Sequence, residues 1–110
     1  MSVQELNSIE ELDKVLEENE KVILACSLTT CIPCKEVYPK YEALCEESKE
    51  KDIVFIKMTF DLLPEGEKDI LKKKYNIPRF PAFVLLVNGI CFETRQTDNI
   101  EHVKSLLSYI

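Results

Sequence analysis

The hydrophobic pattern of the chain alternates between short apolar runs and stripes at helical spacing. Residues 22–27 and 53–56 are continuous apolar runs of strand length, typical of strands covered on both faces. Between them, Val37, Tyr41 and Leu44 form one stripe among charged residues, which predicts a long helix. This order predicts a crossover unit in which a helix joins two strands of the same sheet.

Further segments extend this unit in both directions. Residues 3–6 predict a short edge strand, and helical spacing predicts helices over 9–19 and 64–75. A last helix is expected to begin near Asp98, because Glu101 three residues later completes a capping box. The inward side of the third helix is expected to carry Ile70, Leu71 and Tyr75.

Asn88-Gly89 separates two apolar runs, residues 82–87 and 90–94, and predicts a hairpin in which both turn residues have positive φ. The whole order is then βαβαβαββα. We therefore expect an α/β fold with a mixed central sheet of about five strands, flanked by four helices on both faces. Its 110 residues predict a single domain over 1–110.

The charge balance restricts the partners of this chain. Its 14 Lys and Arg against 20 Asp and Glu give a net charge of −6, which disfavours binding to nucleic acid or anionic lipid. No apolar run approaches the roughly 18 residues of a membrane span. The N-terminus lacks the pattern of a secretory signal, and five cysteines is an odd number. These features favour a reducing compartment, and we expect a monomer in the cytoplasm.

The strongest chemical signal is Cys31-Ile32-Pro33-Cys34, at the junction between a predicted strand and a predicted helix. Two cysteines three residues apart at a helix start can reach each other. If Cys31 is the N-cap, the backbone N–H of Cys34 points at its sulfur, and the helix dipole favours a thiolate there.

The energy needed for such a thiolate exceeds what the helix dipole supplies. Lowering the pKa of a cysteine from about 8.5 to about 7 takes about 2 kcal/mol. The dipole contributes about 0.3–1 kcal/mol. Hydrogen bonds from the Cys34 N–H and S–H are therefore expected to supply the remainder, while Cys34 keeps its own proton until it attacks a mixed disulfide.

A zinc site is the main structural alternative for this cysteine pair. Zinc requires four ligands, and the chain has no second Cys-x-x-Cys and only one histidine, so we expect no metal. The remaining cysteines have no partner at motif spacing and are expected to be small buried hydrophobes: Cys26, Cys45 and Cys91. Of these, Cys91 on the second strand of the hairpin is the one most expected to be exposed and modified.

In this order and spacing the motifs resemble the thioredoxin family over nearly the whole chain. The Cys-Ile-Pro-Cys segment resembles the redox motif of that family, and Ile77-Pro-Arg-Phe-Pro81 resembles the segment that ends in its cis-proline. Other matching positions are Lys35, Pro39, Lys57, Asp61 and the Asn88-Gly89 hairpin. The residues alone favour an ordinary trans Pro81, since few X–Pro bonds are cis.

The resemblance implies a thiol–disulfide oxidoreductase that reduces protein disulfides. Cys31 would be the nucleophile, Cys34 the resolving cysteine and Lys57 a supporting residue. The residues implied for substrate binding are Thr30, Ile32, Pro33, Phe80, Pro81 and Thr97. The backbone of Phe80 is expected to pair with an extended substrate segment. No bound cofactor is implied, and the chain carries no nucleotide site. Electrons would come from NADPH through a separate flavin-dependent thioredoxin reductase.

Two other functions fit a thioredoxin fold. One is a protein-binding module with weak or no catalysis, and the other is a glutathione-dependent relative of the glutaredoxins. The second normally has a Gly-Gly pair downstream of its proline, which this chain lacks.

Three departures from the family pattern concern the predicted site. Thr30 stands where the family usually has Trp, Ala25 where it has a buried Asp, and Thr97 where it has Gly. With Ala25 in place of Asp, Lys57 is expected to lack its usual partner. It would then favour the Cys31 thiolate, or simply extend its ammonium group into solvent.

Overall fold

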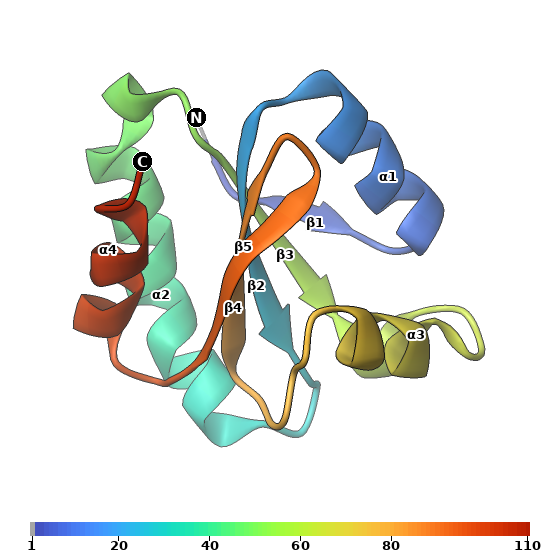
Figure 1. Ribbon diagram of the computed structural model, residues 1–110. Coiled ribbons are helices and arrows are strands. Elements are labelled where there is room, and N and C mark those ends of the chain that lie inside the picture. Colours follow the sequence, from blue (N-terminus) through green and yellow to red (C-terminus); the bar gives the residue numbers. More distant parts are fainter. Residues whose placement is uncertain (1) are drawn as a thin grey trace.

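The computed structural model describes residues 2–110. Within this range the strands form one mixed five-stranded sheet in the order β1-β3-β2-β4-β5 (Figure 1). The β1, β3 and β2 pairings are parallel, and β2 pairs antiparallel with β4, which forms a hairpin with β5. The strands are β1 (Gln4–Leu6), β2 (Lys21–Ser27), β3 (Val54–Thr59), β4 (Ala82–Val87) and β5 (Ile90–Gln96).

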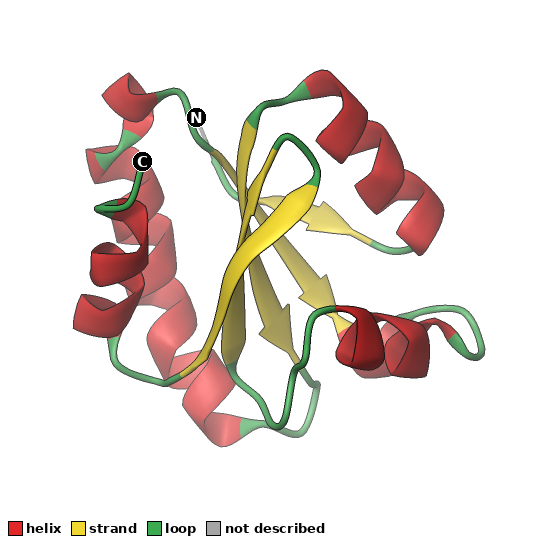
Figure 2. Ribbon diagram, viewed as in Figure 1, coloured by secondary structure: helices red, strands yellow, loops and turns green. Residues whose placement is uncertain are grey.

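The α-helices of the described residues cover both faces of this sheet. Helices α2 and α4 pack on one face, and α1 and α3 lie on the other (Figures 1 and 2). The helices are α1 (Ile9–Glu18), α2 (Ile32–Glu47), α3 (Glu67–Lys74) and α4 (Ile100–Leu107), with short 3₁₀ helices η1 (Lys49–Lys51) and η2 (Phe60–Leu62). This arrangement confirms the α/β class and the mixed sheet predicted from the sequence.

Strand β2 is buried on both faces because its side chains alternate between the two cores. Val22, Leu24 and Cys26 belong to the core under α1 and α3. Ile23 and Ala25 belong to the core under α2 and α4. A strand with apolar side chains on both faces is stable only at the centre of a covered sheet, and β2 is the middle strand.

Helix α2 is fixed to the sheet by Tyr41, whose side chain is fully buried. Its hydroxyl donates to the carbonyl oxygens of Ile23 in β2, at 3.0 Å, and Ile56 in β3, at 2.9 Å. Its ring centroid lies 5.2 Å from that of Phe55 and 5.4 Å from that of Phe83. Tyr41 therefore sets the distance between the helix and the two central strands.

The third helix differs from the prediction at its start. Helix α3 begins at Glu67 rather than near Pro64, because Gly66 adopts a φ of 87° and serves as the N-cap. Leu71 is buried as expected, but Ile70 is 55% exposed. Residues four apart share one side of a helix, so the side that buries Leu71 and the following Tyr75 turns Ile70 toward solvent.

The turn of the hairpin confirms its prediction, whereas the last helix begins one residue late. Asn88 and Gly89 have φ values of 53° and 78°. The N-cap of α4 is Asn99, whose side chain accepts from the Glu101 N–H at 2.9 Å, and Asp98 lies outside the helix. The Thr97 hydroxyl accepts from the Asn99 N–H at 3.0 Å and so holds the asparagine at the cap position.

We predict that Tyr41→Phe destabilises the fold by about 1–3 kcal/mol, because two buried carbonyl oxygens lose a donor. Urea unfolding followed by circular dichroism measures the change. Tyr109→Phe is the matched control, since Tyr109 is 51% exposed. Equal stability of the two variants would show that the Tyr41 hydroxyl does not stabilise the helix–sheet contact.

Candidate active site

The first turn of α2 carries the cysteine pair at the carboxyl end of β2. Cys31 is the N-cap, and its sulfur accepts from the backbone N–H of Cys34 at 3.2 Å. Ile32 and Pro33 occupy the first two helical positions, where the missing N–H of proline costs nothing. The structure confirms the N-cap geometry predicted from the cysteine spacing.

The two cysteines are joined by a disulfide, with their Cα atoms 5.3 Å apart. Cys31 is half-buried, whereas Cys34 is only 4% exposed. One sulfur is therefore open to a partner molecule, and the other is covered by the protein.

The loop before Cys31 is held in place by Asp61 in η2. One carboxylate oxygen of Asp61 accepts from the Thr29 N–H at 3.0 Å, and the other accepts from the Thr29 hydroxyl. These hydrogen bonds lower the pKa of Asp61. The Cys31 N–H in turn donates to the Leu28 carbonyl at 3.2 Å, so the loop has a defined conformation up to the sulfur.

The Phe80–Pro81 peptide bond is cis, as the family resemblance implies. Pro81 lines the same cavity as Cys34, which places this segment beside the disulfide. Phe80 is half-buried, and its ring centroid lies 5.2 Å from that of Phe60 in η2. The Pro81 carbonyl accepts from the Thr97 N–H at 3.2 Å and so joins this segment to the loop before α4.

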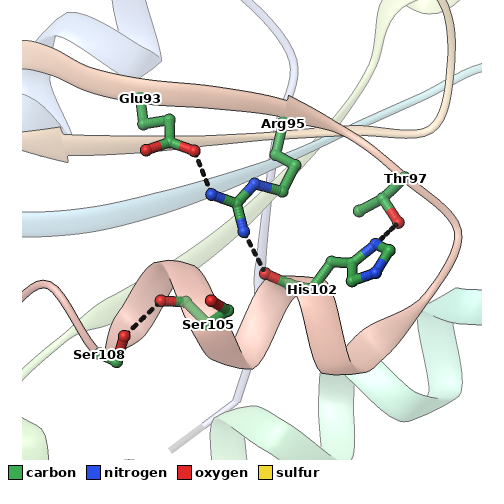
Figure 3. Close-up of polar contacts among 6 residues, drawn as sticks. All are labelled: Glu93, Arg95, Thr97, His102, Ser105 and Ser108. Atoms are coloured by element: carbon green, nitrogen blue, oxygen red, sulfur yellow. Dashed lines mark hydrogen bonds and ion pairs between the residues drawn. The ribbon is translucent and has the colours of Figure 1, made fainter.

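The Thr97 side chain is 7% exposed, and its hydroxyl is used within that loop (Figure 3). Thr97 Oγ1 lies 2.8 Å from His102 Nδ1 and accepts from the Asn99 N–H. Arg95 pairs with Glu93 and donates to the His102 carbonyl, which ties β5 to α4 (Figure 3). Thr97 therefore joins the Pro81 segment to the final helix.

The other residues expected to bind substrate lie at the surface around Cys31. Thr30, Ile32 and Pro33 are exposed, and Ile32 is 67% exposed. Leu62 in η2 is 66% exposed, although the sequence analysis did not single it out. Asp61, which holds the loop before Cys31, matches the family and directly precedes Leu62. This match could have pointed to Leu62 as a residue near the site.

A small cavity lies beneath the disulfide where the family usually has a buried Asp. Its volume is about 10 Å³, close to the minimum for one water molecule. The residues around it include Ala25, Cys34, Tyr38, Lys57 and Pro81. Because alanine has no carboxylate, nothing on residue 25 fills this space.

Lys57 lacks the family's Asp as a partner because Ala25 stands there, but it has a substitute partner in β1. Its Nζ lies 3.8 Å from Glu5 Oε1 in β1 and 4.3 Å from the centroid of the Tyr38 ring. The other oxygen of Glu5 accepts from the Thr59 hydroxyl at 3.1 Å. Burial, followed by the carboxylates of Glu42 and Glu5, raises the pKa of Tyr38. Sequence reasoning missed Glu5, although parallel pairing of β1 with β3 would have aligned it with Lys57.

The remaining cysteines are free thiols. Cys26 and Cys45 are buried, and burial raises the pKa of both thiols; Cys91 is half-buried. Across residues 2–110 there is no group of three or more His, Cys, Asp or Glu side chains placed to hold a metal ion. In the same range no helix is both long and apolar enough to cross a membrane.

A mixed sheet of this topology, with a cysteine pair bonded at the start of α2 and a cis-proline beside it, defines a thiol–disulfide oxidoreductase of the thioredoxin fold. Comparison with known proteins agrees: residues 2–110 match the family model described as Thioredoxin. The chain is 32% identical to thioredoxin 1 of Plasmodium falciparum over 105 residues, covering 96% of this chain and 94% of that protein. The chain therefore belongs to the thioredoxin family.

Solved structures show the same relationship. A Plasmodium falciparum thioredoxin superimposes with a TM-score of 0.83 at 29% identity, covering 97% of this chain and 98% of that one. Reduced Schistosoma mansoni thioredoxin gives a TM-score of 0.82 at 27% identity, covering 99% and 98%. The family relationship implies protein disulfides as substrates.

We predict that Ala25→Asp destabilises the fold by about 1–3 kcal/mol near neutral pH, because a carboxylate would be buried where Lys57 already pairs with Glu5. Burial raises the folded-state pKa of such an Asp above its unfolded value of about 3.9, so the loss should shrink as the pH falls through the raised pKa.

Urea unfolding at about pH 7 and about pH 5 tests this sign. Ala25→Asn is the matched control, since it adds a similar volume without a charge and should show no such pH dependence. A loss for Ala25→Asp that is the same at both pH values would contradict the electrostatic explanation.

Proposed function

We propose that this protein works as a reductant of protein disulfides, with Cys31 as the nucleophile and Cys34 as the resolving cysteine. The observation that carries this proposal is the position of Cys31 as N-cap of α2. Its sulfur accepts from the Cys34 N–H at 3.2 Å, and Cys31 is half-buried whereas Cys34 is 4% exposed. After reduction, the same amide and the helix N-terminus favour a thiolate at Cys31.

The reaction then has two displacements. The Cys31 thiolate attacks one sulfur of the client disulfide and forms a mixed disulfide, and the other client sulfur leaves as a thiolate. Cys34 loses its proton and attacks Cys31 Sγ, which breaks the bond to the client. The client gains two electrons and takes up protons from water, and the Cys31–Cys34 disulfide is formed.

Client docking is assigned to the surface on both sides of Cys31. The exposed side chains of Thr30, Ile32 and Pro33 supply one side. On the other side, an extended client segment pairs with the backbone of Phe80 ahead of Pro81. Thr97 lies beside this segment, because its N–H donates to the Pro81 carbonyl. Main-chain pairing makes such docking tolerant of client sequence.

The electron supply and the compartment follow from the same assignment. We propose that NADPH reduces the Cys31–Cys34 disulfide through a separate flavin-dependent thioredoxin reductase, and that the protein is a cytoplasmic monomer. The free thiols of Cys26, Cys45 and Cys91 support a reducing compartment. We further propose that residues 1–110 act as one domain, which is supported by a single sheet with a core on each face.

Insulin reduction with dithiothreitol as electron donor tests the function. We expect turnover by the wild-type protein and its loss, by at least about a hundred-fold, in Cys31→Ser, because no other described thiol is an N-cap. Cys91→Ser is the matched control and should retain turnover. Insulin reduction that does not depend on Cys31 would contradict the proposal. An inactive wild-type protein would instead favour a binding module. Activity with glutathione but not with a thioredoxin reductase would favour a glutaredoxin-like function.

The reduction potential of the Cys31–Cys34 pair tests the direction of electron flow. A reductant is expected near −270 mV, about that of thioredoxin, measured by equilibration with glutathione or dithiothreitol buffers and thiol trapping. Cys91→Ser again serves as the control for thiols outside the pair. A value near −120 mV, about that of a strong oxidant, would reverse the assigned direction.

A further inference from the structure

The resolving step requires an ionised sulfur in a covered position. Cys34 is 4% exposed, and burial disfavours the charged thiolate that must attack Cys31. A fixed positive charge nearby would offset this cost. The helix N-terminus is already engaged with the other sulfur through the Cys34 N–H.

Lys57 provides such a charge on the Cys34 side of the disulfide. Of the described residues around the cavity beneath Cys34, Lys57 alone is cationic, and Cys31 does not border this cavity. The Lys57 side chain is only 22% exposed, so solvent screens its charge less than that of a surface lysine. The ring of Tyr38 covers it at 4.3 Å and borders the same cavity.

The sheet register supplies a counter-charge from one direction only. In the sheet register, Lys57 in β3 lies opposite Glu5 in β1 on one side and opposite Ala25 in β2 on the other. Ala25 in turn lies opposite Phe83 in β4. Ala25 and Phe83 carry no charge. Helix α2 adds Lys35, which borders a surface groove together with Lys57, and Glu42, one turn beyond Tyr38.

We propose that the Lys57 ammonium stabilises the thiolate of Cys34 during the resolving step, and that Glu5 weakens this effect by partly neutralising the ammonium. In this step the Cys34 thiol gives its proton to water and its sulfur bonds to Cys31 Sγ. The bond between Cys31 and the client sulfur breaks, and the client leaves with the electron pair. The inference rests on the proposed function, because it assigns residues to the second displacement.

The charge assignment predicts effects of opposite sign for the two members of the pair. Lys57→Met removes the positive charge, so the resolving step should slow about ten-fold and reach half its maximal rate at a higher pH. Glu5→Gln removes the negative charge, so the resolving step should accelerate about two- to three-fold. A purely structural role would make both variants slower.

Stopped-flow reaction of the reduced protein with one equivalent of dithiobis(nitrobenzoate) separates the two displacements. Attack by Cys31 releases the first coloured thiolate, and attack by Cys34 on the mixed disulfide releases the second. We expect both variants to change the first phase less than the second, because Cys34 borders the same cavity as Lys57 and Cys31 does not. The pH dependence of the second phase is recorded for each variant.

Matched variants separate charge from packing. Lys57→Arg keeps the positive charge and should resolve at close to the wild-type rate. Lys40→Met and Glu18→Gln remove the same charges from exposed positions of α2 and α1 and should leave the second phase unchanged. Circular dichroism confirms that each variant is folded.

Several results would overturn the inference. These are an unchanged second phase in Lys57→Met, a larger effect on the first phase than on the second, a slower second phase in Glu5→Gln, or equal slowing by Lys57→Arg and Lys57→Met. Failure of the proposed function gives a different result, because Cys31→Ser would then retain the first phase or insulin reduction would not depend on Cys31.

Discussion

The contact between the Cys34 N–H and the Cys31 sulfur depends on where α2 begins. The contact exists because Cys31 is the N-cap, three residues before Cys34 in the first turn. The start of the helix is fixed by contacts on either side of it, one in the preceding loop and one further along α2. Asp61 holds the loop that leaves β2, and Tyr41 fixes the next turns of α2 to the central strands. A helix that began one residue later would direct a different amide at the sulfur.

The electrostatic design of the site differs from the family pattern in where its carboxylate lies. Ala25 leaves the position beneath Cys34 uncharged, and the nearest carboxylate partner of Lys57 comes from the edge strand instead. Glu5 is 45% exposed, so water and salt screen it more than they would screen a buried group. The interior of the site is therefore less polar than the family pattern implies, and its charges lie nearer to solvent.

The sequence predicted the features that depend on local pattern. The buried runs of β2 and β3, the Asn88-Gly89 turn and the N-cap role of Cys31 each follow from residue type and spacing, and all are present. The cis Pro81 came from the family resemblance, since local preference favours trans. The partner of Lys57 was missed because it depends on the register of two strands that are about 50 residues apart in sequence.

Strand β1 has three residues and pairs on one side only, with β3. Short edge strands open at a lower free-energy cost than the central strands of a sheet, so β1 can fray while the cores on both faces remain intact. Glu5 reaches Lys57 only while β1 is paired with β3. Fraying of β1 would therefore break this ion pair and leave the Lys57 ammonium near the thiol pair without its counter-charge. Amide hydrogen exchange at Glu5 and Leu6 would report this opening, which couples the outermost strand of the sheet to the reactivity of its centre.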